Sequence, residues 1–313
     1  MRDGRSFVTV WIALGFLWLA WGYNFLVIKI TLPYVGPFQF ALLRTWLSFV
    51  ALAIWLAYVG RLRWPKENGG LLAMLGLLQT GGFTGFTYLA LVSGGTGKTA
   101  LLAFTNPLWA TLVAWYVLAE RPRRSQLIAV GMAVVGILLV VQWWTGTSSL
   151  QSNLFALGAG ISLGSSSIVI KKLQQRGETD LIHITAWQML FGSLPLLLAV
   201  ILVSERPLIV NSIFAFGLAY NVVTTAVGWP LWAYILKKMP AGVANMNTLV
   251  IPIVGLYTGW WHLGERWSDA DLLGIALVLM SLMMVWVAPL ATRKFNELKQ
   301  RGGSMVDEAG KGG

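Results

Sequence analysis

The sequence predicts an all-α membrane protein whose ten transmembrane helices form two inverted repeats of five helices each. Three observations lead to this prediction. Of the 313 residues, 57% are hydrophobic and 11% are charged, whereas soluble globular chains carry about 25% charged residues. The apolar residues gather in runs of about 20, the length that an α-helix needs to cross a bilayer. An internal repeat then divides these runs into two halves.

Ten apolar runs follow one another along the chain and are numbered here as spans 1 to 10. They cover roughly residues 8–28, 37–59, 70–92, 98–118, 126–144, 153–170, 182–203, 211–236, 242–263 and 270–290. The first run follows two arginines, as in a signal peptide, but it is too long for one and is expected to remain as a span. The connections are only a few residues long, so we expect no soluble domain between spans.

One segment of the chain occurs twice. Residues 106–141 read as an apolar helix, a short charged turn and a second apolar helix, and a shift of 145 positions reproduces this pattern without a gap. The shift places Pro107 on Pro252. A shift of 142 positions places Gly22 on Gly164. A fixed register over about 35 residues indicates a duplication rather than a shared composition.

The repeat is expected to be inverted, because each half holds an odd number of spans and the second half must enter the membrane from the opposite side. We expect a first five-helix repeat over 1–150, a second over 151–292 and a disordered cytoplasmic tail over 293–313. With a cytoplasmic N-terminus, the inner segments hold 18 Lys and Arg residues and the outer segments hold 4. This excess predicts a multi-pass protein of the cell inner (plasma) membrane with both termini in the cytoplasm.

Charge and cysteine content exclude several functions. The net charge of +11 would suit nucleic acid, but the Lys and Arg residues lie in short clusters between the spans, so we predict no nucleic-acid partner. The chain has no cysteine and two histidines, which argues against thiolate and histidine-rich metal sites. We expect no cofactor and no metal, and as partners a small-molecule substrate and the lipid bilayer. The oligomeric state stays open, and a monomer is compatible with the sequence.

Residues 94–99 spell GGTGKT, which looks like the end of a nucleotide-binding P-loop. That motif needs a glycine five positions before Gly97, where this chain has Val92. The segment also joins two spans on the predicted outer side. We therefore expect a tight turn between helices rather than a phosphate site.

The ordered set of motifs resembles a known family. It comprises the paired Pro-to-Glu-Arg segments, WGYNFLVIK at the end of span 1, Arg44 in span 2 and Gln188 at the corresponding position of the second half. Over residues 8–290 the chain is similar to the drug/metabolite transporter superfamily, and more narrowly to its ten-span exporters with two EamA-type repeats. The resemblance implies outward secondary transport of small metabolites, often amino acids or amphipathic drugs. It also implies a cavity lined by spans 1, 3, 4, 6, 8 and 9, with spans 5 and 10 at the periphery.

Polar side chains inside the spans are the candidates for substrate binding, since an amide in hydrocarbon is costly unless it meets a partner or water. Asn221, Thr225 and Trp232 recur at helical spacing on span 8 and form one polar and aromatic stripe. Gln79 begins a similar stripe on span 3. With the resemblance, the candidate substrate-binding residues are Gln79, Asn221, Thr225, Trp232, Asn245, Trp21, Trp109 and Ser166. Contacts between helices are the alternative role for each of them.

Two prolines and one arginine have candidate roles of their own. Pro107 and Pro252 each remove a backbone hydrogen bond inside a span and predict a kink, so spans 4 and 9 are candidate gates, with static kinks as the alternative. Arg44 lies roughly 10 Å beyond Pro37 along span 2. The resemblance favours a structural role for this charge over a substrate contact.

Carboxylates are absent from the middle of every predicted span. Glu120 and Glu265 lie at helix ends, where ion pairing or helix termination is expected, and a proton-coupled carrier would lack its usual buried carboxylate. An intramembrane enzyme would need a nucleophile with a base, paired carboxylates or metal ligands, and none is found at membrane depth. We therefore predict a secondary transporter that exports amino acids or related amphipathic compounds by alternating access. Efflux of amphipathic drugs is the main alternative, and uptake stays open.

Overall fold

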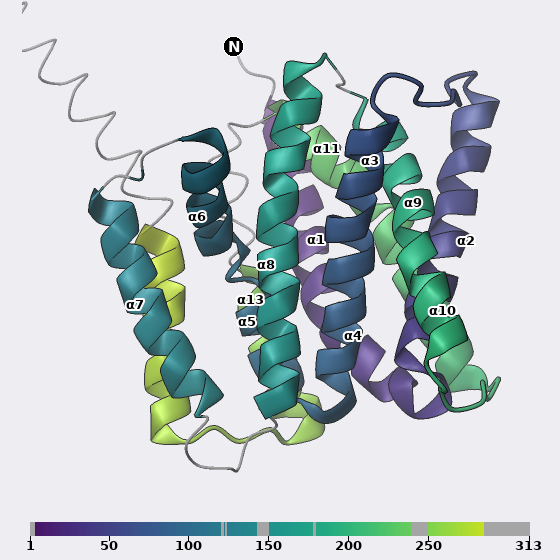
Figure 1. The fold of residues 1–313 in the computed structure, drawn as a ribbon. Coiled ribbons are helices and arrows are strands. Elements are labelled where there is room, and N and C mark those ends of the chain that lie inside the picture. Colours follow the sequence, from purple (N-terminus) through teal and green to yellow (C-terminus); the bar gives the residue numbers. More distant parts are fainter. Residues whose placement is uncertain are drawn as a thin grey trace, which may run out of the picture.

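The computed structural model describes residues 4–119, 122, 124–142, 150–177, 180–238 and 250–284. Across these ranges the chain forms helices and their connections, with no strand. Most of the long helices run side by side in one bundle (Figure 1). The prediction of an all-α membrane protein is confirmed.

The helices of the first half correspond to spans 1 to 5. They are α1 (Gly4–Thr31), α2 (Pro37–Tyr58), α3 (Gly69–Leu75), the π-helical segment η2 (Gly76–Gly82), α4 (Phe83–Ser93), α5 (Thr96–Ala103), α6 (Asn106–Leu118) and α7 (Arg124–Val141), with a short 3-10 turn, η1 (Leu32–Tyr34), after α1. Span 3 thus consists of α3, η2 and α4, and span 4 consists of α5 and α6.

The second half contains α8 (Leu150–Gln175), α9 (Leu181–Leu202), α10 (Ser212–Ala226), α11 (Gly228–Lys238), α13 (Val250–Leu263) and a further helix over residues 269–284. Eight segments of the described chain are long and apolar enough to cross a membrane, and they correspond to predicted spans 1 to 8. Spans 9 and 10 contain α13 and the 269–284 helix. The predicted tail and Glu120 lie outside the described residues.

Side chains cap the helices that begin in the loops. Asp180 Oδ1 accepts the backbone N–H groups of Ile182 and His183 at 3.2 and 3.3 Å, at the start of α9. Asn211 Oδ1 accepts that of Phe214 at 2.8 Å, at the start of α10. These bonds satisfy donors that the first turn of a helix leaves free, so the loops can stay short.

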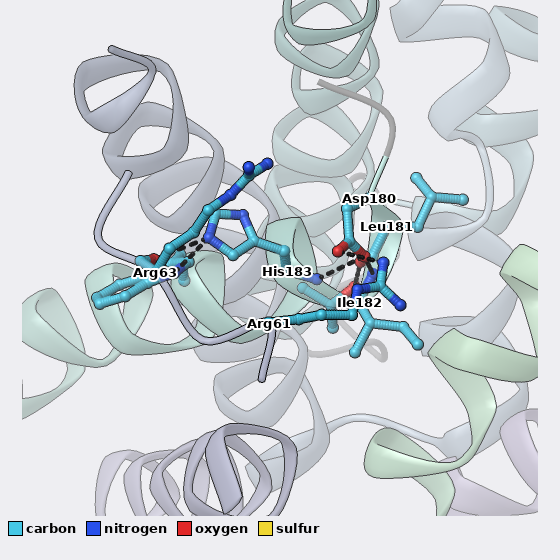
Figure 2. Close-up of polar contacts among 8 residues, drawn as sticks. Arg61, Arg63, Asp180, Leu181, Ile182 and His183 are labelled. Carbon is cyan, nitrogen blue, oxygen red and sulfur yellow. Dashed lines mark hydrogen bonds and ion pairs between the residues drawn. The ribbon is translucent and has the colours of Figure 1, made fainter. Parts of the chain in front are cut away.

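The loop between α2 and α3 is bound to the start of α9 (Figure 2). Arg61 forms an ion pair with the capping carboxylate of Asp180. The backbone carbonyl oxygen of Arg63 accepts a hydrogen bond from Trp187 Nε1 at 3.0 Å and lies 2.9 Å from His183 Nε2. His183 is buried among these contacts, so its environment is that of a packed loop anchor at one end of the bundle.

The two sequence shifts also relate two close contacts between helices. A Cβ atom added to Gly22 on α1 would lie 2.5 Å from Val254 Cβ on α13, and one added to Gly164 on α8 would lie 2.8 Å from Trp109 Cβ on α6. Gly164 is Gly22 shifted by 142 positions, and Val254 is Trp109 shifted by 145. Span 1 therefore packs on span 9 as span 6 packs on span 4.

Spans 5 and 10 form a separate pair at one side of the bundle, where α7 lies beside the yellow 269–284 helix (Figure 1). A Cβ atom on Gly136 would lie 2.8 Å from the carbonyl oxygen of Gly274, so the two helices approach to backbone contact. Within the pair, Gln142 Nε2 at the end of α7 donates to Asp271 Oδ1 at 2.6 Å. Asp271 also ties the pair to α5 through an ion pair with Lys98 at 2.7 Å.

Candidate functional site

A cavity of about 250 Å³ lies between helices of both halves. Its walls come from α1, α2, η2, α4, α8 and α11 and from the break between α5 and α6. They comprise Trp21, Asn24, Phe25, Ile28, Arg44, Gln79, Phe83, Thr84, Thr87, Tyr88, Phe104, Asn106, Leu163, Ser166, Ser167, Ile170, Trp229 and Trp232. Most of these residues lie well inside their spans, so the cavity lies within the thickness of the bundle, and its volume suits a small metabolite.

One wall of the cavity is aromatic. The Trp21 ring lies 5.5 Å from that of Trp229 and 6.3 Å from that of Trp232, centroid to centroid. Trp21 Nε1 donates to the Thr224 carbonyl oxygen at 3.3 Å, which anchors the indole of α1 on α10. Gly228 permits this approach, because a Cβ atom there would lie 2.7 Å from Trp21 Nε1. Such a wall can hold an apolar group or face a cation.

Another wall carries a charged and polar network. Arg44 Nε donates to Thr225 Oγ1 at 3.0 Å, and an Arg44 Nη1 N–H donates to the Tyr88 hydroxyl oxygen at 3.3 Å. The Tyr88 hydroxyl donates to Asn221 Oδ1 at 3.0 Å, and Asn221 Nδ2 donates to the Gly217 carbonyl oxygen at 2.9 Å. The network joins α2, α4 and α10 and fixes the position of the guanidinium group.

The π-helical segment of span 3 places Gln79 in the cavity wall. Ser166 Oγ on α8 lies 3.5 Å from Gln79 Oε1. On its other side, the segment packs closely on α9, since a Cβ atom on Gly81 would lie 2.7 Å from Pro195 Cγ. Such π-helical turns inside α-helices are frequent at functional sites.

Described carboxylates lie outside the cavity wall, at the ends of the bundle. Glu265 Oε1 accepts the backbone N–H of Thr96 at 2.5 Å and its hydroxyl at 2.8 Å, while Oε2 accepts the N–H of Gly97 at 3.1 Å. Glu205 accepts two backbone N–H groups of the first turn of α2, at 2.8 and 2.9 Å. The GGTGKT segment is therefore the capped start of α5, as the expected tight turn requires.

Known proteins share this architecture of two helical halves. The EamA-like transporter family matches the chain twice, over residues 9–142 and 150–287. The chain belongs to the EamA-like transporter family. It is a multi-pass membrane transporter of small metabolites. Such a protein contacts its small-molecule substrate and the surrounding lipid.

Several relatives cover most of this EamA-like chain. A "Probable amino-acid metabolite efflux pump" of Salmonella typhimurium is 27% identical over 276 residues, which are 84% of this chain and 90% of that protein. The "Uncharacterized transporter YoaV" of Bacillus subtilis is 25% identical over 273 residues, 85% of this chain and 92% of that protein. A crystal structure of one protein aligns with a TM-score of 0.58 at 17% identity, over 92% of this chain and 99% of that one. That likeness shows the fold alone.

Most of the residues that the sequence analysis singled out lie in or directly behind the wall of this cavity. Its wall includes the predicted residues Trp21, Gln79, Ser166 and Trp232, together with Arg44. The predicted Asn221 and Thr225 lie behind this wall and are buried, where they position Tyr88 and Arg44. Asn245 lies outside the described residues.

Trp109 differs from the expectation, since it does not line the cavity. Its Nε1 donates to Thr105 Oγ1 at 3.0 Å, and its Cβ packs against Gly164 of α8. Gly164 brings α8 against the Cβ atom of Trp109, so this side chain takes part in the contact between α6 and α8. Asn106, three residues earlier on α6, does line the cavity.

The two prolines were expected inside their spans. Pro107 does lie inside span 4, which runs from Thr96 to Val117. It stands in the first turn of α6, where its missing N–H costs little, because the helix is interrupted just before it. Pro252 is buried near the start of the described part of α13. The stretch 239–249 before it lies outside the described residues, so the structure does not describe a kink there.

Tyr88 was missed by the sequence analysis. It lies nine residues after Gln79, which would place the two side chains on opposite faces of a regular α-helix. Both nevertheless line the cavity, because the π-helical turn over 76–82 changes the helical register between them. The adjacent glycines at 81 and 82 are the local signal that could have indicated this irregularity.

Proposed function

We propose that this chain is a secondary transporter of the inner membrane that exports amino acids or related amphipathic compounds by alternating access. The observation that carries the proposal is the cavity between the two halves, with an aromatic wall at Trp21, Trp229 and Trp232 and a polar wall at Gln79 and Arg44. A molecule with one apolar and one polar end would fit both walls. The name of the Salmonella relative, an amino-acid metabolite efflux pump, agrees with this class of substrate.

Alternating access would come from rocking of the repeat over 1–150 against the repeat over 151–292 around the cavity. The matched contacts of Gly22 and Gly164 support this, since each glycine joins one helix of the first repeat to one helix of the second. Spans 4 and 9 would act as gates at Pro107 and Pro252. The break between α5 and α6 gives span 4 a place to bend without further loss of hydrogen bonds.

The excess of Lys and Arg residues in the loops on one side of the membrane supports an orientation with both termini in the cytoplasm. A single cysteine can be introduced cleanly because the chain has none. A cysteine at Val92, which is 46% exposed, should react with an impermeant thiol reagent on intact cells, whereas one at Tyr58, 89% exposed, should react only after permeabilisation. The opposite pattern would invert the assignment.

Efflux of amphipathic drugs is the second candidate, and the aromatic wall favours it, because indole faces also bind organic cations. Counterflow in proteoliposomes tests both candidates. Vesicles preloaded with one unlabelled amino acid or drug would be assayed for uptake of its labelled form. We expect exchange of apolar amino acids down their own gradient, with little response to an imposed pH step. Purified, monodisperse protein that exchanges none of the panel would contradict the proposal.

A further inference from the structure

Arg44 places a permanent positive charge in the wall of the central cavity. The described hydrogen bonds of its guanidinium group go to neutral oxygens, the hydroxyls of Thr225 and Tyr88, and the group also lies 6.0 Å from the centre of the Tyr88 ring. None of the residues that line the cavity is Asp or Glu. In the part of the chain that the structure describes, this charge therefore has no counter-charge. An unbalanced charge at such depth is costly and marks a functional site by default.

The contacts of Arg44 occupy only part of its hydrogen-bonding capacity. A guanidinium group has five N–H donors in a planar fork, and the described hydroxyl contacts use two of them. Carboxylates match this fork, because two parallel N–H···O bonds can form at once. Arg44 lines the cavity, so a carboxylate bound there could accept hydrogen bonds from its remaining N–H donors.

Neighbouring residues hold the guanidinium group in place. Tyr88 is fully buried, and its hydroxyl bridges Arg44 to Asn221 on α10. Thr225, one turn further along α10, fixes the Nε side of the group. A charge fixed before the ligand arrives loses little freedom on binding, so it can contribute strongly to affinity.

A second polar atom of the cavity lacks a partner. Asn24 lines the cavity from α1, and its Oδ1 is buried with no donor within hydrogen-bonding distance among the described residues. A side-chain carbonyl oxygen without a donor can accept a hydrogen bond from an ammonium group. The indole faces of Trp21 and Trp232 in the same cavity can also attract such a group.

We infer that Arg44 binds the carboxylate of the transported molecule, and that Asn24 accepts a hydrogen bond from its ammonium group. This inference rests on the proposed transport function and narrows it. The cavity selects zwitterionic apolar amino acids over amphipathic cations that lack an acid group. The assignment also replaces the structural role that the sequence favoured for Arg44.

The test measures binding to purified protein by isothermal titration calorimetry, without transport. L-Phenylalanine is compared with its methyl ester and with phenethylamine, which keep the ring and the ammonium group and lose the negative charge. The wild-type protein should bind both analogues at least tenfold more weakly than phenylalanine. Arg44→Gln should reduce the affinity for phenylalanine to that for phenethylamine and leave the amine unchanged, with Arg44→Lys in between. The matched control is Arg206→Gln, which removes an exposed arginine outside the cavity.

Several outcomes would overturn the inference. These are equal affinities across the wild-type series, no binding of phenylalanine, or an equal loss for acid and amine in Arg44→Gln. The comparison of the three ligands on wild-type protein still tests the carboxylate preference if the Arg44→Gln protein does not fold. If the protein carries out counterflow but shows no preference for compounds with a carboxylate, this inference is refuted and the proposed transport function still stands. Carboxylate-selective binding without any counterflow would refute the proposed function and leave the binding site intact.

Discussion

The ends of the helices and the middle of the bundle use charge in opposite ways. At the ends, Glu265 and Glu205 accept backbone N–H groups of α5 and α2, and Lys98 pairs with Asp271. In the middle, Arg44 donates hydrogen bonds to two neutral hydroxyls and lies over the ring of Tyr88, with no carboxylate among these described contacts. End charges therefore stabilise the fold, because they satisfy helix donors and each other. The charge in the cavity is left for a ligand.

The largest effect on stability should follow from Glu265→Ala. The substitution leaves the N–H groups of Thr96 and Gly97 without their acceptor in a buried turn. The free energy of unfolding should fall by about 3 kcal/mol, since each unsatisfied buried donor costs about 1–3 kcal/mol. Chemical unfolding in detergent measures this loss. Glu205→Ala should lower the free energy of unfolding by less, because Glu205 accepts two hydrogen bonds and Glu265 accepts three. A folded Glu265→Ala protein with a changed substrate preference would contradict the contrast between the helix ends and the middle of the bundle.

A smaller loss is expected where helices of the two halves touch. Gly164→Ala should cost about 2 kcal/mol, because the new Cβ would overlap Trp109 Cβ and the Asn106 carbonyl oxygen. Gly15→Ala is the matched control on α1, since nothing lies within 4 Å of its added Cβ. That control should be neutral or slightly stabilising, as alanine favours a helix over glycine. Equal melting temperatures for the two variants would contradict the close contact.

The smallest expected effect is a change in apparent KM, and it should differ between tryptophans in the cavity and tryptophans outside it. Trp232→Ala removes part of the aromatic wall and should raise the apparent KM several-fold, more for bulky substrates than for small ones, because the loss scales with buried apolar area. Trp261 is 63% exposed and stacks on Tyr257 outside the cavity, so Trp261→Ala should leave the preference order unchanged. Counterflow against a substrate series compares the two. A preference change only in Trp261→Ala would reverse the assignment.

Much of the fold could be predicted from local properties of the sequence. Composition and run length indicated the helical membrane protein, and the fixed shifts indicated a duplication, in which Gly22 corresponds to Gly164. Of the predicted stripe, Asn221 and Thr225 lie one turn apart on α10, and both bond to the network around Arg44. Trp232 on α11 lines the cavity beside Trp21. Periodicity is informative wherever the helix is regular.

Sequence reasoning failed where the helices are irregular or the contacts are distant. The π-helical turn hid Tyr88, and the close contact of Gly164 with α6 takes up Trp109 outside the cavity wall. The surroundings of Arg44 could not be predicted at all, since Thr225 lies 181 residues away on another helix. Whether a buried charge is paired depends on such long-range packing, which local spacing does not encode.

The most direct test of the account asks whether substrate occupies the central cavity. Ser167 is an exposed residue of the cavity wall on α8, and a cysteine there can be modified with a small methanethiosulfonate reagent in a chain that has no other cysteine. We predict that modification of Ser167→Cys abolishes counterflow, and that excess phenylalanine slows the labelling of this position but not of Tyr58→Cys. Full labelling with unchanged counterflow, or equal protection at both positions, would contradict the central cavity as the transport site.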